Sequence, residues 1–235
     1  MYNEYEGWDL EDFDNAKNFR SYQFDFILPF IKGKTAEIGP GTGANVEHYL
    51  SKVNTLSLYE PTIKLFQILK TKYQGNQNIE VYNKTFTDID IKFDTIIYLD
   101  VLEHIKEDKK EFLNAYDKLN ANGSLIINVP AFNFLYSQYD KDINHYKRYS
   151  KKDLKSFLEL TEYSYSKLIY YDSIGFFLAI LSKHFLNKNY KKNFKKKISI
   201  WNSLIPLSKF FDKCFFHSFG KSLIFILQKW ITANI

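Results

Sequence analysis

The chain has 235 residues, 45% of them hydrophobic and 25% charged, with a formal net charge of +5 and a single cysteine, Cys214. This is the balance of a globular protein with a sizeable core, and one cysteine excludes both an internal disulfide framework and a cysteine-rich zinc site. The acidic opening residues contain no apolar run, and no stretch reaches the roughly 18 apolar residues of a membrane-spanning helix, so we expect a cytoplasmic protein without a signal peptide.

Helical and strand patterns alternate along the first 130 residues. Residues 10–31 place apolar side chains at helical spacing and predict one or two helices. Apolar runs predict strands at 33–39, 55–60, 78–86, 93–102 and 124–130, and helices are predicted at 43–53, 61–74 and 107–120. Pro61 is predicted in the first turn of its helix. The alternation predicts an α/β fold with a mostly parallel sheet covered on both faces.

The rest of the chain begins with a predicted helix at 150–160, capped by Ser150, and has further strands at 165–175 and 221–230. Between these strands, residues 175–219 form an aromatic and basic helical insertion. Its lysine cluster consists of Lys188, Lys191, Lys192, Lys195, Lys196 and Lys197. A charge run is ordinarily a solvated face; the alternative is an anionic partner, either a phosphate-bearing substrate or a membrane surface.

The stretch "TAEIGPGTGANVEHY" concentrates three of the nine glycines of the chain, Gly39, Gly41 and Gly43. Glycine permits positive φ and lets a ligand approach the backbone closely, and a helix that starts after such a turn offers unpaired N–H groups. A strand, a glycine-rich turn and a helix in this order predict a site for a nucleoside-bearing cofactor. Taken alone, "GPGTGA" also fits a dinucleotide fingerprint.

The acid two residues before the first glycine helps to choose the cofactor. Glu37 can accept hydrogen bonds from a cationic group but would repel a pyrophosphate. S-adenosylmethionine has no phosphate, and its amino group and sulfonium are positive. The pattern therefore favours S-adenosylmethionine over a nicotinamide dinucleotide.

Four motifs, "AEIGPGTG", "LYEP", "YLDVLEHI" and "GSLIINVP", follow one another in an order and spacing that resemble class I S-adenosylmethionine-dependent methyltransferases. The third is close to the form seen in ubiquinone-pathway O-methyltransferases. The resemblance implies a Rossmann-like class I methyltransferase fold, S-adenosylmethionine as cofactor and methyl transfer as the reaction.

A longer segment, "NVPAFNFLYSQYDKDINHYKRYSKKDL", is similar to a subgroup with a "VPA…D…HYRRYS…L" pattern. The stretches "AKNFRSY" and "FGKSLIF" match two further motifs of that subgroup, whose members resemble proteins found beside sugar and surface-polysaccharide genes in bacteria. This implies O-methylation of a small-molecule, sugar or glycan-related acceptor, with N-methylation left open.

The resemblance divides the chain into segments of a single methyltransferase domain, 1–235. These are a helical segment (1–32), a cofactor-binding core (33–130), a substrate-side segment (131–174), the basic and aromatic insertion (175–219), and a last strand with a tail (220–235).

The resemblance also assigns cofactor contacts. The three glycines would line the methionine side, and Glu37 would orient the methionine amino group. Glu60, at the end of the second strand, would accept two hydrogen bonds from the ribose hydroxyls, as a carboxylate can. Pro61 would flank the adenine, and Asp88 would meet the adenine amino group with Thr87 beside it.

At the end of the fourth strand, the resemblance places Asp100 and Leu102 at the cofactor, with Leu102 as a wall of the site. Glu103 and His104 follow directly. Short polar residues at this position are equally well read as a pair that caps a helix.

On the substrate side, His145 is the candidate general base, since a neutral histidine can take a proton from a hydroxyl near pH 7. A structural role is the alternative. Its expected partner is Asp140 or Asp142. Arg148 is expected to hold an anionic group bidentately or to pair with an acid in a lid. The expected substrate pocket comprises Tyr146, Arg148 and Tyr149, and no metal site is predicted.

Three other functions are alternatives. A nicotinamide-dependent oxidoreductase would need a second nucleotide-binding half and would place Glu37 badly. A non-catalytic protein of the same fold could retain the cofactor or have lost it, and the intact glycine loop with Glu60 argues against complete loss. A nucleic-acid substrate is disfavoured because "LDVL" stands where a base-methylating N-P-P-[YF] motif would lie. Peripheral contact with the inner membrane face and the oligomeric state are left open.

Overall fold

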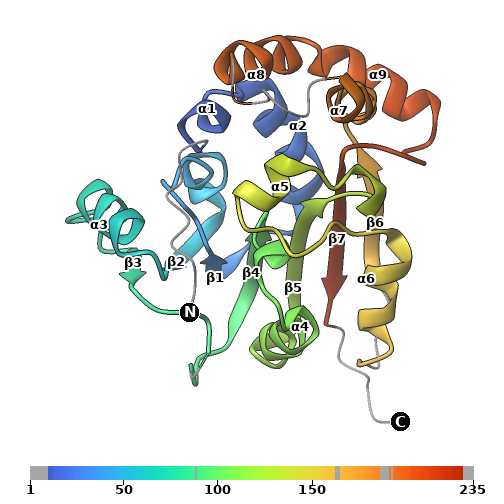
Figure 1. The fold of residues 1–235 in the computed structure, drawn as a ribbon. Coiled ribbons are helices and arrows are strands. Elements are labelled where there is room, and N and C mark those ends of the chain that lie inside the picture. Colours follow the sequence, from blue (N-terminus) through green and yellow to red (C-terminus); the bar gives the residue numbers. More distant parts are fainter. Residues whose placement is uncertain (1–9, 88, 162–164, 186–190, 192, 230–235) are drawn as a thin grey trace.

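The computed structural model describes residues 10–87, 89–161, 165–185, 191 and 193–229. Its strands form one seven-stranded sheet in the order β3-β2-β1-β4-β5-β7-β6 (Figure 1). They are β1 Gly33–Ile38, β2 Val53–Tyr59, β3 Ile79–Tyr82, β4 Phe93–Leu99, β5 Leu119–Pro130, β6 Tyr165–Tyr171 and β7 Ser222–Gln228. The pairs from β3 to β5 are parallel, and β7 runs antiparallel to both of its neighbours. The predicted fold class, a Rossmann-like and mostly parallel sheet, is confirmed.

Helices cover the sheet on both sides. They are α1 Leu10–Asp14, α2 Lys17–Ile27, α3 Ile63–Lys72, α4 Asp108–Asp117, α5 Gln138–Asp142, α6 Lys151–Leu158, α7 Ser173–Phe185, α8 Phe194–Ser203 and α9 Ile205–Cys214. Short 3₁₀ turns are η1 Leu28–Phe30, η2 Val46–His48, η3 Leu50–Lys52, η4 Leu102–His104 and η5 Asn133–Leu135. The predicted cap of α6 is present, since Ser150 Oγ accepts from the Asp153 amide and the Asp153 carboxylate accepts from the Ser150 amide.

Two apolar layers hold the sheet between them. Phe112 of α4 and Phe157 of α6 belong to the core on one face, and Phe19 of α2 and Trp201 of α8 belong to the core on the other. The central strand β5 is buried continuously from residue 123 to residue 129. Continuous burial is expected of a strand with both faces covered, so the layered prediction agrees with the packing.

The segment after the glycine loop differs from its prediction. Residues 43–53 were expected to form an α-helix, but they form the 3₁₀ turns η2 and η3. Val46 and Tyr49 are both completely buried, and in a 3₁₀ turn residues three apart lie on the same side. The tighter turn thus buries both side chains and directs the Tyr49 hydroxyl to Glu37.

Two predicted boundaries also change. Helix α3 begins at Ile63 with Thr62 as its N-cap, so Pro61 precedes the helix instead of standing in its first turn. The reason is Glu60, whose side chain accepts the Thr62 amide and fixes the chain before the helix starts. The helix predicted at 107–120 is shorter than expected, because α4 ends at Asp117 and β5 already begins at Leu119.

The predicted insertion is helical: α7, α8 and α9 lie together along one end of the molecule (Figure 1). Within the part of the chain that the structure describes, no helix combines the length and the apolar character needed to cross a bilayer.

Candidate active site

A cavity of about 800 Å³ opens where the parallel strands β1, β2, β4 and β5 end. Ligands of open α/β sheets bind outside the carboxyl ends of the strands, so this is the expected place for a site. Many of the residues predicted from the sequence line it: Gly39, Gly41, Glu60, Pro61, Thr87, Asp100, His145, Tyr146 and Arg148.

The glycine loop supplies the floor of the cavity. Gly41 has φ of +60°, a conformation that side-chain-bearing residues rarely adopt, and its amide donates to Glu60 Oε2 at 3.2 Å. Gly39 has φ of +62°, and a Cβ there would lie 2.8 Å from Val101 Cγ2. The loop therefore needs glycine for its own conformation as well as for the approach of a ligand.

Glu60 lies at the end of β2 and is almost fully buried. Its Oε2 accepts from the Gly41 amide and its Oε1 accepts from the Thr62 amide at 2.9 Å. A carboxylate has about four acceptor positions, so each oxygen keeps one more. Glu60 lines the cavity, and the two backbone donors fix the orientation in which it can accept further hydrogen bonds.

Asp100 and Arg20 meet across the cavity wall. Asp100 follows β4 with φ of +58°, and strain of this kind at a non-glycine residue is typical of functional sites. Its Oδ1 accepts from Asn128 Nδ2 at 2.7 Å, and its Oδ2 lies 3.8 Å from Arg20 Nη1. Arg20 Nε is buried and has no hydrogen-bond partner among the described residues, which leaves a donor for an anionic group.

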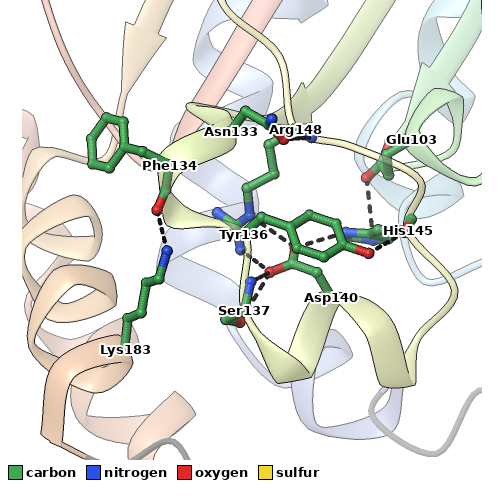
Figure 2. Close-up of polar contacts among 9 residues, drawn as sticks. All are labelled: Glu103, Asn133, Phe134, Tyr136, Ser137, Asp140, His145, Arg148 and Lys183. Atoms are coloured by element: carbon green, nitrogen blue, oxygen red, sulfur yellow. Dashed lines mark hydrogen bonds and ion pairs between the residues drawn. The ribbon is translucent and has the colours of Figure 1, made fainter.

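The substrate-side segment folds around Asp140, as Figure 2 shows. Asp140 is completely buried and lies 3.0 Å from His145 Nδ1. It also accepts from the Ser137 amide and hydroxyl at 2.8 and 3.0 Å. Burial alone would raise the pKa of Asp140, but the hydrogen bond with His145 and the Arg148 guanidinium hold that pKa well below its usual value. Asp140 therefore stays ionised and orients the imidazole.

Arg148 pairs with an acid, as the second of its two predicted roles requires. Its Nε donates to Asp140 Oδ1 at 2.8 Å and its Nη2 to Oδ2 at 3.1 Å. The fork is thus occupied by a protein carboxylate, while Nη1 is buried without a partner among the described residues. Asp142, the other candidate partner of His145, instead accepts from Gln138.

Glu103 and His104 do not cap a helix: neither η4 nor the following α4 has a side-chain cap hydrogen bond. Both line the cavity beside His145. The rings of His104 and His145 meet edge to face at 4.6 Å, and Glu103 Oε1 lies 3.7 Å from His145 Nε2.

Comparison with known proteins separates the remaining alternatives. Residues 36–127 match a family model described as a methyltransferase domain, and the sheet order is that of the class I fold. Residues 36–127 therefore match a methyltransferase domain, and the chain as a whole has the class I Rossmann-like methyltransferase fold. The family match favours a methyltransferase over the nicotinamide-dependent oxidoreductase. The search of curated proteins gave no match.

Solved structures of similar fold agree with this assignment. The N-methyltransferase NodS from Bradyrhizobium japonicum, in complex with S-adenosylhomocysteine, is 11% identical with a TM-score of 0.59, over 94% of this chain and 91% of that one. A putative methyltransferase from Bacillus halodurans is 14% identical with a TM-score of 0.60, over 89% and 98%. Haemonchus contortus phosphoethanolamine N-methyltransferase 2, with S-adenosylmethionine, is 13% identical with a TM-score of 0.66, over 98% and 60%. Identities this low show the fold.

The cavity of this methyltransferase fits S-adenosylmethionine. The open acceptor positions of Glu60 suit a ribose diol. Gly41 lines the cavity floor without a side chain, so a ligand can approach its backbone closely. The unpartnered Nε of Arg20 suits the carboxylate of the methionine portion. The residues present would thus hold the nucleoside at β2 and the methionine portion near β1 and α2.

Some predicted residues lie behind the cavity wall. Leu102 packs in the core, and the Tyr149 hydroxyl donates to Asp108 at 2.9 Å and to the Leu102 carbonyl at 3.1 Å. Gly43 and Glu37 are not among the lining residues. Asp88 lies outside the described residues. The predicted cofactor or substrate contacts of these residues stay predictions.

Arg20 and Tyr136 line the cavity, but the sequence did not single them out as site residues. The only signal for Arg20 was its place inside the "AKNFRSY" match. Tyr136 donates its hydroxyl to the His145 carbonyl at 2.6 Å and so fixes the loop that carries the histidine. Nothing in the sequence distinguished it from the other tyrosines.

We expect Glu60→Ala to weaken S-adenosylhomocysteine binding by about 1.5–3 kcal/mol, the usual range for hydrogen bonds to a charged group, or roughly 10- to 150-fold in Kd. Isothermal titration calorimetry measures the effect. Glu80→Ala, which removes an exposed acid from β3, is the matched control. Equal affinities of Glu60→Ala and the wild type would show that the ribose lies elsewhere.

Glu37 predicts a pH dependence of stability. It is buried beneath the loop, where the Tyr49 hydroxyl donates to it, and burial raises its pKa to about 7 from an ordinary 4.5. The unfolded chain ionises this group at lower pH than the folded chain does, so its contribution to stability is present below about pH 4.5 and is lost as the pH rises towards 7. The loss is on the order of 3 kcal/mol.

Urea unfolding of the ligand-free protein from pH 5 to 8 tests this expectation. Glu37→Gln should lack this part of the pH dependence, whereas Glu47→Gln, at an exposed acid of η2, should keep it. Identical pH profiles for wild type and Glu37→Gln would contradict the burial of an ionisable carboxyl group here.

Proposed function

We propose that this methyltransferase transfers the methyl group of S-adenosylmethionine to a hydroxyl oxygen of a small-molecule, sugar or glycan-related acceptor. The observation that carries the proposal is the pair formed by His145, which lines the cavity, and the buried Asp140 behind it, with Nδ1 and Oδ1 3.0 Å apart. A sugar hydroxyl is a weak acid and benefits from a base when it attacks a carbon.

The pair fixes the state in which the imidazole acts. The ionised carboxylate of Asp140 accepts a hydrogen bond from Nδ1–H, so the neutral ring carries its lone pair on Nε2. Tyr136 and Arg148 hold the loop and the acid from either side. His145 is therefore placed to take up the hydroxyl proton at Nε2.

The cofactor, when bound, supplies an activated methyl carbon. This chain contributes alignment and the exclusion of water, and alignment alone is worth on the order of 7–11 kcal/mol in favourable cases. Cationic side chains on the wall, among them Arg20, Arg148 and Lys221, suit an acceptor that carries a phosphate or another anionic group.

Transfer from S-adenosylmethionine with a ¹³C-labelled methyl group tests the acceptor atom. Monosaccharides, their phosphates and nucleotide sugars would be offered, each beside its amino-sugar counterpart. The proposal expects O-methyl carbon signals in both members of a reactive pair. Label on nitrogen alone, or no label in a protein that binds S-adenosylhomocysteine, would contradict it.

A further inference from the structure

We propose that Glu103, His104 and His145 form a binding site for a divalent transition-metal ion on the acceptor side of the cavity. The inference adds to the proposed function, on which it rests for the role of the ion but not for the existence of the site. The sequence predicted no metal site, because the pattern of residues gave no sign that the loop of His145 returns to η4.

The three side chains converge closely enough to share one ion. One ligand atom from each lies within 4.8 Å of the others. His145 Nε2 and Glu103 Oε1 are 3.7 Å apart, which is too long for a direct hydrogen bond. Two ligands bonded at about 2.0–2.2 Å to one ion lie at most about 4.4 Å apart, so small side-chain adjustments complete the site.

Glu103 points to a missing partner. The residue is completely buried, and neither carboxylate oxygen has a hydrogen-bond partner among the described residues beyond the approach of its own amide. A buried carboxyl group whose two oxygens have no hydrogen-bond partner is costly in either protonation state, and a cation between Glu103 and the imidazoles would give both oxygens a partner.

The surroundings also prepare the histidines to bind a metal. Asp140 bonds to Nδ1 of His145, which leaves Nε2 for the ion, and metal-bound histidines ordinarily have such a carboxylate partner. Backbone groups of Ile143 and Asn144 bond to the ring of His104 and restrain it. Two imidazoles and one carboxylate suit Zn²⁺, Mn²⁺ or Fe²⁺, and coordination positions on the cavity side stay open.

An ion here would bind the acceptor oxygen and lower the pKa of its hydroxyl. His145 would then act as a ligand, whereas in the metal-free protein it would accept the proton itself. Addition of a chelator to the transfer assay separates these two roles of His145: a metal-bound His145 predicts loss of turnover, and a His145 that accepts the proton itself predicts unchanged turnover. The binding test below is a separate measurement.

The binding test needs no acceptor. Chelator-treated protein would be titrated with Zn²⁺ and Mn²⁺ by calorimetry and with Co²⁺ by visible absorption. We expect one ion per chain, with the affinity reduced at least tenfold in both Glu103→Gln and His104→Gln and unchanged in His48→Gln, a histidine of the 3₁₀ turn η2 outside the cavity.

Failure of the wild type to bind any of the three ions would overturn the proposal, as would equal binding by both cavity variants. If either Glu103→Gln or His104→Gln does not fold, the metal affinity of the other variant still tests the site. Acceptor methylation without metal binding would reject the ion while leaving the proposed function intact.

A second observation, independent of the cavity, concerns the layer of α7 and α9 in Figure 1. Apolar side chains here face solvent; the exposed aromatic patch comprises Phe134, Phe177, Leu181, Leu207, Phe210, Phe215 and Phe216. Phe210 is 60% exposed and Phe216 is 89% exposed. The rings of Phe134, Phe177, Phe210 and Phe215 are joined in a continuous chain of contacts by Phe176, Phe219 and Phe211. Large exposed apolar patches mark interaction sites.

The charge of the same region is one-sided. Residues 173–235 contain eleven lysines and one acid, Asp212, a net charge of +10, so residues 1–172 carry −5 of the total of +5. Asp212 is completely buried, and Lys213 of α9 is exposed next to the patch, whereas Lys209 is half-buried and pairs with Asp25 of α2 at 2.8 Å. Apart from this paired Asp25, the surface presents aromatic rings and positive charge, since no described acid on α7, α8 or α9 is exposed.

We infer that the exposed aromatic patch docks on an anionic lipid surface. Aromatic side chains prefer the interface of a bilayer, and basic residues near an anionic leaflet strengthen such binding. None of the patch residues lines the cavity, so membrane contact and methyl transfer can be tested separately.

Cys214, the single cysteine, is exposed on α9 and provides the probe. Protein labelled there with an environment-sensitive fluorophore would be mixed with vesicles of phosphatidylcholine alone or with phosphatidylglycerol. We expect a blue shift and flotation with anionic vesicles only, weakened by salt.

Both signals should be lost in Phe210→Ser/Phe216→Ser and reduced in Lys209→Glu/Lys213→Glu. Leu160→Ser, at an exposed leucine outside the patch, should leave them unchanged. No flotation of the wild type would overturn the inference. So would flotation that survives both double substitutions, or a dimer that dissociates in Phe210→Ser/Phe216→Ser, which would assign the patch to a second copy of the chain.

Discussion

His145→Ala should lower kcat by about 10²–10⁴-fold, the usual contribution of a general base. The affinity for S-adenosylhomocysteine should stay nearly the same, because the groups that fit the cofactor are the glycine loop, Glu60 and Arg20 and do not include His145. His145 itself lines the acceptor side and is held by Asp140. Steady-state turnover with the acceptor found by methyl labelling, together with calorimetry, measures the two quantities.

His217→Ala is the matched control, since this histidine bonds to the Tyr170 carbonyl and does not line the cavity. Its turnover should equal that of the wild type. Unchanged turnover of His145→Ala, or a loss explained entirely by unfolding, would return His145 to a structural role.

Gly41→Val should abolish measurable binding of S-adenosylhomocysteine. A branched residue would be forced to φ near +60°, which costs roughly 1–2 kcal/mol, and its side chain would project from a lining position. The Gly41 amide would also lose its fixed approach to Glu60. This strain lowers the stability of the free and the bound protein alike, so the loss of binding comes from the valine side chain that occupies the cavity floor.

Gly75→Val is the control that separates backbone strain from obstruction of the cavity by a side chain. Gly75 also has positive φ, +84°, but a Cβ there meets nothing within 4 Å, and the residue does not line the cavity. Both variants should lose stability, as thermal melting would show, and only Gly41→Val should lose the ligand. Wild-type affinity in a folded Gly41→Val protein would place the cofactor away from the loop.

The cofactor side of the site could be predicted from the sequence because its signals are local. A strand, a glycine turn and an acid at the end of the next strand are each visible within a few residues. Parallel strands then bring Gly41 and Glu60 to the same edge of the sheet, where the structure joins them by a hydrogen bond.

The acceptor side depended on contacts between distant segments. Arg20 meets Asp100, and Glu103 meets His145, across loops whose paths no periodicity specifies. Asp140 and Asp142 looked equivalent in the sequence, and only the turn of α5 decides that Asp140 faces the histidine.

Local patterns also failed where tertiary packing overrode them. The residues after Gly43 look like an α-helix, but burial of Val46 and Tyr49 together favours 3₁₀ turns. The same turns bring Tyr49 over Glu37 and bury this acid beneath the loop, a contact that the sequence did not indicate.

A crystal structure of the protein with S-adenosylhomocysteine tests the central claim, that this cavity is a methyl-transfer site. The account predicts the ribose hydroxyls on Glu60, the homocysteine portion beside Gly39 and Gly41, and open space between the sulfur and His145. A ligand bound outside this cavity, or one whose sulfur faces away from His145, would contradict it.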